Sequence, residues 1–199
     1  MKKLQTKLLS TLFILASSYA FSQFQFGAKI GGGISNTTVV HGISKERIGL
    51  IGGLVGKYQL SSRTEDHYLQ AELLYTNQGE YSVDRSGKKY KAFVDYLNIP
   101  IMYKFYFDDQ GSDFFLEAGP QIGFVISDNI DPLGPEAENN ELKSLDIAFN
   151  VGVGYSYNRT FEANIRYGIG LVDTYGYKRW DNDINRTSFL TLGLTYFFN

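Results

Sequence analysis

Apolar and polar residues alternate one by one along several stretches of this chain, and this period of two is typical of β-strands. In residues 145–157 every odd-numbered position is apolar or aromatic, whereas the even-numbered positions are Asp, Ala, Asn, Gly, Gly and Ser. The same pattern predicts strands over residues 97–107, 114–126, 161–171 and 188–198. Weaker alternation predicts three more, over residues 24–34, 48–60 and 69–75. Residues 48–60 are apolar on both faces, so the pattern leaves the register of that strand open.

The connections between these predicted strands are alternately long and short. Residues 61–67, 108–113 and 158–160 form short connections, and residues 36–47, 77–94, 128–143 and 172–186 form long ones. Bacterial outer-membrane barrels have short periplasmic turns, longer extracellular loops and an even number of strands, of which eight is the smallest. We therefore predict an all-β protein, an eight-stranded antiparallel up-and-down transmembrane β-barrel with both termini in the periplasm.

The composition agrees with this fold. The chain has 15 Tyr, 15 Phe and 21 Gly, against 4 Pro and a single Trp. Tyr and Phe are favoured in strands, and in membrane barrels they form girdles at the strand ends. The predicted outward aromatic residues gather near the short connections, as such a girdle requires. The alternative is a soluble periplasmic ligand-binding β-barrel, which would turn these aromatic side chains into the interior.

The first residues have the features of an export signal. Lys2, Lys3 and Lys7 precede an apolar stretch over residues 8–16, which is too short to span a bilayer as a helix. Small residues permit cleavage after Ser22 or after Ala20, and we favour Ser22. The predicted domains are therefore a signal peptide over 1–22 and an outer-membrane β-barrel domain over 23–199. The chain has no cysteine, which excludes disulfides and a lipoprotein anchor.

Six segments carry a resemblance to a known family. They are YLNIP at 96–100, YKFYF at 103–107, EAGP at 117–120, GVGY at 152–155, RYGIGL at 166–171 and LGLTYFF at 192–198. With these segments the chain resembles the PorT-like outer-membrane β-barrel family of Bacteroidetes, a family of small OmpA/OmpX-like barrels often called porin family proteins. One departure is that Asn199 follows Phe198, because the last residue read by the barrel-assembly machinery is usually aromatic.

The resemblance implies an architecture and a location more than an activity. It implies the outer membrane of a Gram-negative bacterium, insertion by the barrel-assembly machinery, and contact with outer-membrane lipid and lipopolysaccharide. For function it leaves envelope structure, surface interaction and narrow, porin-like solute passage open. It also leaves a surface or secretion-system protein open as a partner.

Charged residues occupy predicted inward positions, and their signs balance. They are Lys29, Lys57, Glu72, Lys104, Glu117, Asp146, Glu162 and Arg166. Buried charges must be paired and hydrogen-bonded, and eight strands leave an interior that side chains just fill. We therefore predict a lumen charge network that plugs the barrel. The alternative is an ion-conducting lumen lined by Arg166 and Glu117.

Three clusters in the long connections are candidate interaction sites. Tyr175, Tyr177, Lys178, Arg179 and Trp180 form a candidate surface for a sugar or a protein. Asp84, Arg85, Lys88, Lys89 and Lys91 form a largely basic cluster that could meet lipopolysaccharide phosphates. Asp128, Asp131, Glu136, Glu138 and Glu141 could hold a divalent cation, although they lack the spacing of a calcium loop. The alternative for each cluster is an ordinary solvated loop.

The sequence predicts no catalytic, cofactor-binding or metal site. A lipid-modifying enzyme needs a base near a nucleophile, but His41 and His67 lie on opposite sides of the predicted membrane. Ser35 and Ser44 lie near His41 in sequence without an accompanying carboxylate. The formal net charge of −2 and the lack of a basic stripe also argue against binding of nucleic acid.

Overall fold

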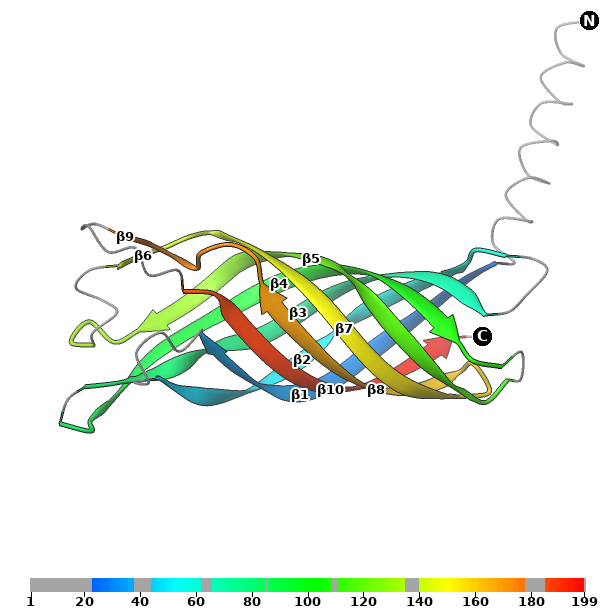
Figure 1. Ribbon diagram of the computed structural model, residues 1–199, viewed down its shortest axis with the longest axis horizontal. Coiled ribbons are helices and arrows are strands. Elements are labelled where there is room, and N and C mark those ends of the chain that lie inside the picture. Colours follow the sequence, from blue (N-terminus) through cyan, green and yellow to red (C-terminus); the bar gives the residue numbers. More distant parts are fainter. Residues whose placement is uncertain are drawn as a thin grey trace, which may run out of the picture.

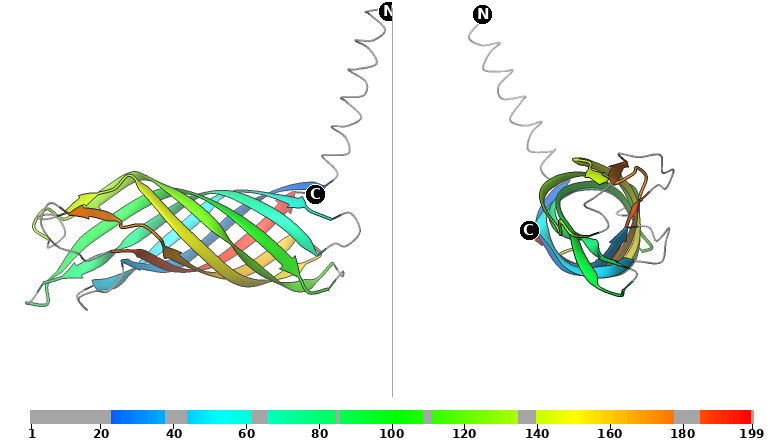
Figure 2. Two further views of the ribbon diagram at one scale, coloured as in Figure 1. Left: turned by 45° about the horizontal axis from the view of Figure 1, so that its top comes forward. Right: turned by 90° about the vertical axis from the view of Figure 1, so that its left-hand side faces the viewer.

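Eight long antiparallel strands close into a barrel, as the sequence predicts (Figures 1 and 2). The computed structural model describes residues 23–37, 44–61, 66–84, 86–108, 111–134, 140–177 and 185–198. The barrel strands are β1 (Phe24–Thr37), β2 (Ser44–Gln59), β3 (His67–Val83), β4 (Lys89–Tyr106), β5 (Asp113–Ile130), β7 (Leu145–Tyr157), β8 (Phe161–Gly170) and β10 (Thr187–Phe198). Around the barrel their order is β1-β10-β8-β7-β5-β4-β3-β2, so each strand pairs with its neighbours in the chain and β10 closes on β1.

Several strands continue further toward the loop end than the alternation predicts. The predicted long connection over residues 77–94 is wrong, because β3 and β4 stay paired as far as Val83 and Lys89. Two short strands, β6 (Asn140–Leu142) and β9 (Tyr175–Tyr177), pair with each other within the predicted loops. The physical reason is that backbone hydrogen bonds between strands form whether or not one face of the sheet contacts lipid. A strand can therefore continue beyond the point where apolar and polar residues stop alternating. At the loop end the molecule is therefore more ordered than its sequence pattern indicates.

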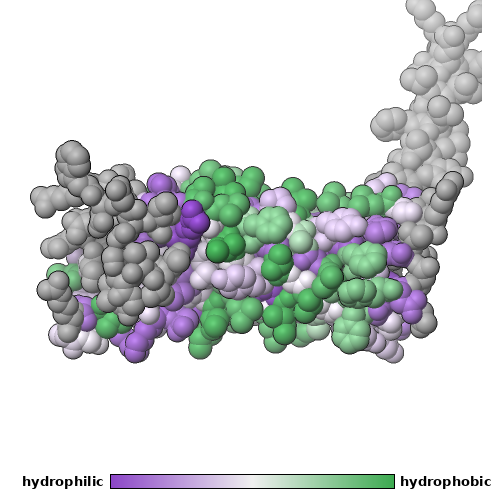
Figure 3. Space-filling model, viewed as in Figure 1, coloured by the Kyte–Doolittle hydropathy of each residue, from purple (hydrophilic) through white to green (hydrophobic). Residues whose placement is uncertain are grey.

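The wall of the barrel is inside-out relative to a soluble barrel. Outward side chains along the middle of the wall are mostly apolar and exposed, whereas most buried inward side chains are polar or charged, with apolar ones such as Met102 and Phe197 among them. The pairing also settles the register of β2, since Lys57 points inward with 0% of its surface exposed and Leu54 points outward with 62% exposed. Figure 3 shows hydrophobic residues along the middle of the wall and hydrophilic ones toward the loop end. This arrangement contradicts the alternative of a soluble barrel with an apolar interior.

Aromatic side chains ring the end of the barrel where the short turns lie. Outward Phe and Tyr side chains there include Phe26, Tyr58, Phe107, Phe114, Tyr155, Tyr157, Phe161, Tyr196 and Phe198. Neighbouring strands bring the rings into contact, for example Phe114 with Tyr155 and Phe161 with Tyr196. The predicted aromatic girdle is therefore present at this end. Across the described part of the chain, no helix is long and apolar enough to cross a membrane.

Gly79 in β3 has a backbone conformation that other residues rarely adopt, with a φ of 109°. A Cβ atom there would also lie 2.2 Å from the carbonyl oxygen of Ala92 on β4. We expect Gly79→Ala to lower the free energy of unfolding by at least ~2 kcal/mol, through backbone strain and this clash. Urea unfolding of the protein refolded in detergent micelles measures the loss.

Gly87 supplies the matched control for this substitution. Its φ of 85° is also positive, but a Cβ atom there would meet nothing within 4 Å. Gly87→Ala is therefore expected to lower stability by only about 1 kcal/mol. Equal losses at the two positions would show that the close approach of β3 to β4 contributes nothing.

Candidate functional site

The interior of the barrel holds the charged side chains, because inward positions recur at every second residue of each strand. On β8 these inward side chains are Glu162, Asn164 and Arg166, and all three are buried. Two groups of ion pairs form around them. The middle cluster surrounds Arg166, and the turn-end cluster surrounds Glu162, four residues nearer the short turn between β7 and β8.

The middle cluster is built around the guanidinium of Arg166. Its Nη1 and Nη2 atoms donate to the two carboxylate oxygens of Glu72 at 3.0 Å and 2.8 Å. Its Nε atom donates to Oε1 of Glu117 at 2.9 Å. Lys29 Nζ donates to Glu72 Oε1 at 3.3 Å, and Asn164 Nδ2 donates to Glu117 Oε1 at 2.6 Å. Four strands, β1, β3, β5 and β8, are therefore tied together across the lumen.

The turn-end cluster is built around the carboxylate of Glu162. Lys57 Nζ donates to Oε1 at 2.8 Å, and the Tyr106 hydroxyl donates to the same oxygen at 2.5 Å. Lys104 Nζ donates to Oε2. The two clusters are continuous, since Lys104 Nζ also lies 3.8 Å from Oε2 of Glu117. Together they join four cations to three carboxylates across six of the eight barrel strands.

Aromatic rings pack around the turn-end cluster. Tyr68, Tyr106 and Phe115 form a buried group, and Tyr106 lies in ring contact with the other two. The ammonium of Lys57 lies 3.9 Å from the ring centroid of Phe197. The ammonium of Lys104 lies 3.9 Å from the ring centroid of Phe115. Both cations therefore make cation–π contacts in addition to their ion pairs. A layer of charges and a layer of rings thus fill the same end of the lumen.

Seven of the eight residues predicted for the lumen network are joined in this way. The eighth, Asp146, also points inward and is buried, but its Oδ2 atom accepts a hydrogen bond from the Thr187 hydroxyl at 3.0 Å. It lies nearer the loop end and, among the described residues, forms no ion pair. Three neutral side chains also belong to the network, and a count of charges does not find them: Gln70, Tyr106 and Asn164. Their inward position in the alternation is the only sequence signal for them.

The lumen narrows to small polar cavities on the loop side of Arg166. One of about 20 Å³ is lined by side chains that include Gln78, Asn98 and Gln121. Each of these three amides has one buried atom without a hydrogen-bond partner in the structure. A polar cavity of this size has room for about one water molecule. The space beside the network is therefore sufficient for hydration of single groups and too small for a solute.

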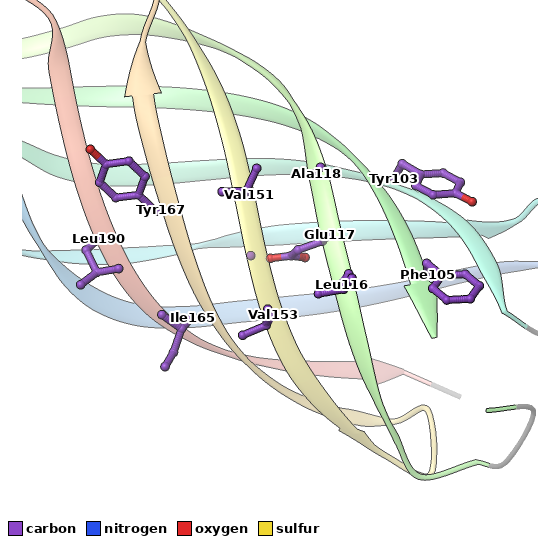
Figure 4. A pocket seen from close by; sticks show the side chains of 11 residues that line it. Tyr103, Phe105, Leu116, Glu117, Ala118, Val151, Val153, Ile165, Tyr167 and Leu190 are labelled. Carbon is purple, nitrogen blue, oxygen red and sulfur yellow. The ribbon is translucent and has the colours of Figure 1, made fainter. Parts of the chain in front are cut away.

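A large hollow lies on the outside of the barrel. It has a volume of about 670 Å³ and is lined by side chains of β4, β5, β7, β8 and β10, including Tyr103, Ala118, Val153 and Ile165 (Figure 4). These side chains stand on the apolar wall. The lumen residue Glu117 also borders the hollow, although its side chain is buried in the charge network. The hollow is therefore an apolar depression in the lipid-facing surface.

The predicted loop surface is only partly described, and one of its members is misplaced. Tyr175 is buried, with 1% of its surface exposed, so its prediction as part of an exposed surface is wrong. The reason is its place in β9, which pairs with β6; Tyr177 lies on the same short strand. Lys178, Arg179 and Trp180 lie outside the described residues, as does His41.

The other candidate sites give little chemistry. His67 lies at the turn end, where its Nδ1 atom is 2.6 Å from the Tyr103 hydroxyl. Within the described residues, no three His, Asp or Glu side chains gather closely enough to hold a metal ion. Of the predicted acidic cluster, Asp128, Asp131 and Glu141 lie among the described residues, and Glu136 and Glu138 lie outside them. The Oδ1 atom of Asp131 accepts from the backbone of Leu133.

An apolar exposed wall around a charged, buried lumen defines a small transmembrane β-barrel of the bacterial outer membrane. The family model for the "Outer membrane protein beta-barrel domain" matches residues 15–176, and the chain belongs to this family. The match does not test the finer resemblance to PorT-like proteins of Bacteroidetes, which stays a prediction. Among curated proteins no match is found.

Solved structures share the fold at low sequence identity. Neisserial surface protein A (NspA) is 14% identical over 88% of this chain and 97% of its own, with a TM-score of 0.50. Ail, the attachment invasion locus protein of Yersinia pestis, is 12% identical over 88% and 99%, with a TM-score of 0.48. The outer membrane enzyme PagL is 12% identical over 84% and 98%, with a TM-score of 0.47. At these identities the likeness concerns the fold alone, and it leaves enzymatic activity undetermined.

Proposed function

We propose that this protein is a closed, non-conducting outer-membrane barrel that serves envelope structure and acts through its loop end. In this proposal the signal peptide 1–22 is removed, with cleavage after Ser22 or Ala20, and residues 23–199 form the barrel. Both termini lie in the periplasm and the barrel-assembly machinery inserts the chain. The short turns at one end of the barrel and the longer segments at the other support this orientation.

The observation that carries the proposal is the continuous ion-pair network across the lumen. The charged groups that line a porin channel are exposed to water, whereas the charged groups of this network are buried and form ion pairs with one another. The bidentate pairing of Arg166 with Glu72 fixes both groups in place. Tyr106 and Phe115 close the same cross-section toward the turn end. Narrow solute passage is the alternative, and it would require these groups to separate.

The closed lumen leaves the loop end as the working part of the molecule. There β3, β4 and β5 continue beyond the apolar wall, and β6 pairs with β9. Function on a rigid scaffold usually lies in such outer segments. A surface or secretion-system protein would meet the barrel here, and its identity is open to experiment.

Single-channel conductance tests the closed lumen directly. The refolded protein, inserted in a planar bilayer and shown to be folded by its heat-modifiable migration on a gel, is expected to give no discrete openings. The charge-neutral double variant Arg166→Ala/Glu117→Ala is expected to stay silent as well, because the turn-end cluster and its rings remain. Discrete openings of the unmodified protein whose conductance changes in the variant would overturn the proposal and make Arg166 and Glu117 a pore lining.

A further inference from the structure

Outward side chains on three adjacent strands change from apolar to polar at one level. At this level Asp95 on β4 accepts hydrogen bonds from Arg47 on β2 at 3.2 Å and from Asn77 on β3 at 2.9 Å. The Tyr75 hydroxyl donates to the other oxygen of Asp95 at 2.8 Å. On the turn side of Asp95, the next outward residue of β4 is Leu97. This hydrogen-bonded group therefore marks the loop-end edge of the apolar wall.

A basic patch lies beyond this edge on the same outward face. It consists of Lys45 and Arg47 on β2, Tyr81 on β3, and Lys89, Lys91 and Phe93 on β4. The register places Lys45 opposite Tyr81, and Tyr81 opposite Lys91, so these three residues form one row across the strands. The rings of Tyr81 and Phe93 meet edge to face, with centroids 5.1 Å apart.

Three of the four cations of the basic patch lie over these rings. The guanidinium of Arg47 lies 4.0 Å from the ring centroid of Phe93, and Lys91 Nζ lies 5.9 Å from it. Lys89 Nζ lies 5.9 Å from the ring centroid of Tyr81. Rings of this kind hold the aliphatic stems of the lysines while their ammonium groups stay in the polar medium. The patch is thus an ordered surface rather than a set of independent side chains.

The positive charge of the patch is largely uncompensated. Arg47 forms an ion pair with Asp95, which lies on the turn side of the patch. Lys45, Lys89 and Lys91 have no carboxylate at ion-pair distance among the described residues. Three exposed ammonium groups therefore face outward together, and an anion in the surroundings is needed to balance them.

Two acidic residues lie near the patch in sequence. Glu46 follows Lys45, but in the pairing of β2 with β3 it stands opposite the buried Glu80, so it lies on the other face of β2 from Lys45. Asp84, in the turn between β3 and β4, accepts hydrogen bonds from the side chain and backbone of Ser86, the backbone of Lys88 and the Tyr90 hydroxyl. The Ser86 hydroxyl is the main cause that holds the pKa of the Asp84 carboxyl below its ordinary value. These hydrogen bonds hold the Asp84 carboxylate in the turn, and among the described residues it forms no ion pair with a lysine of the patch.

The height of the patch matches the headgroup region of a membrane. Lys91 precedes the edge residue Asp95 by four positions on β4 and lies nearer the loop end, which places it about 13 Å away along the strand and about 10 Å along the membrane normal at the usual tilt. The headgroup layer extends roughly 5–8 Å beyond the hydrocarbon. A lysine side chain spans the difference by bending toward the interface. Because the patch faces sideways from the barrel, the groups within its reach are those of neighbouring lipids.

We infer that the basic patch binds the phosphate groups of lipid A in the outer leaflet. The ammonium groups of Lys45, Lys89 and Lys91 pair with phosphate oxygens, and the edges of Tyr81 and Phe93 contact the glucosamine and the upper acyl carbons. The inference depends on the orientation proposed above, since only the outer leaflet contains lipid A. It deepens that proposal by giving the loop end a specific lipid partner.

The test uses the full mature chain, refolded in detergent micelles and titrated with lipid A carrying both phosphates. Binding is read as a rise in the temperature at which the barrel unfolds on a heat-modifiability gel. The double variant Lys45→Gln/Lys91→Gln is expected to bind about 30-fold more weakly, because each lysine near an anionic lipid surface contributes about fivefold. The matched control is Lys143→Gln/Arg186→Gln, which removes two cations from the same end beside β7 and β10, and it is expected to bind as the unmodified protein does.

Three results would overturn the inference. Equal weakening in both double variants would mean that the lipid responds to overall charge. Equal binding of lipid A stripped of its phosphates would mean that the apolar wall alone holds the lipid. Displacement of lipid A by inorganic phosphate at equal concentration would mean a site for the free ion.

The orientation is tested separately, so that its failure is distinguishable. An epitope inserted between Ser86 and Gly87 is expected to be reached by antibody on intact cells. If it is reached only after the envelope is broken, the proposed orientation is wrong, whereas the micelle titration still decides whether the patch binds the lipid phosphate.

Discussion

Replacing Glu162 with Gln is expected to lower the free energy of unfolding by about 3–5 kcal/mol, because it leaves the buried ammonium of Lys57 without an anion and that of Lys104 with only Glu117 at 3.8 Å. Glu162 accepts from Lys57, Lys104 and the Tyr106 hydroxyl at the turn end of the lumen. The amide of Gln keeps the shape of the side chain and removes its charge. The loss therefore reports the electrostatics of the cluster and not a cavity.

Urea unfolding in detergent micelles, followed by the shift between folded and unfolded bands on a gel, measures this loss. The control is Glu46→Gln, which removes the same charge from an exposed position on β2 and is expected to change stability by less than about 0.5 kcal/mol. Lys57→Met should destabilise the Glu162→Gln background less than it destabilises the unmodified protein, since the pair is already broken. A loss below about 1 kcal/mol for Glu162→Gln would show that the cluster is hydrated and that the lumen is open to water.

The lipid-embedded part of the fold is the part that sequence reasoning reaches. Over residues 145–157 the alternation predicts both the strand and its bounds, and the structure confirms them. In the membrane, one face of each strand contacts lipid and must be apolar, while the other faces the polar lumen. Apolar and polar residues therefore alternate along the sequence. Lys57 lies inward as predicted, but here the pairing of β2 resolves a register that the pattern over residues 48–60 leaves open.

The connectivity of the lumen could not be predicted in the same way. Arg166 and Glu72 are 94 positions apart, and Lys57 and Glu162 are 105 apart. Which inward side chains meet depends on the stagger between strands around the closed barrel, and alternation within one strand carries no information on that stagger. For this reason Asp146 is inward as predicted and still bonds to Thr187 instead of joining the network.

The basic patch shows where the pattern ends. Sequence reasoning found Lys89 and Lys91 but treated them as a loop, and it missed Lys45 and Arg47. Beyond the membrane neither face of a strand must be apolar, so the alternation disappears while the pairing continues. The pairing of β2 with β3 is also irregular between Glu46 and Ile51, next to the patch. This irregularity changes which residues of β2 point outward. A single extra residue of this kind re-aims every side chain that precedes it.

The depth of the apolar wall gives the second large effect. Leu54 lies near the middle of β2 on the lipid-facing side, with 62% of its surface exposed, and Ile48 lies beside Arg47 at the edge, with 83% exposed. The two positions are six residues apart, which corresponds to roughly 15 Å of membrane depth at the usual strand tilt. Because a guanidinium loses its hydration in the hydrocarbon core, Leu54→Arg is expected to lower stability in lipid vesicles by about 2–4 kcal/mol.

The same substitution at Ile48 is expected to lower stability by no more than about 1 kcal/mol, since the new side chain reaches the headgroup level where Arg47 already lies. Urea unfolding of both variants in vesicles measures the difference. Exposure alone predicts the reverse of this result or no difference, because Ile48 and Leu54 are both open to the surroundings. A loss at Leu54 that matches the loss at Ile48 would place the edge of the hydrocarbon elsewhere, and the basic patch would then no longer lie at the level of the lipid phosphates.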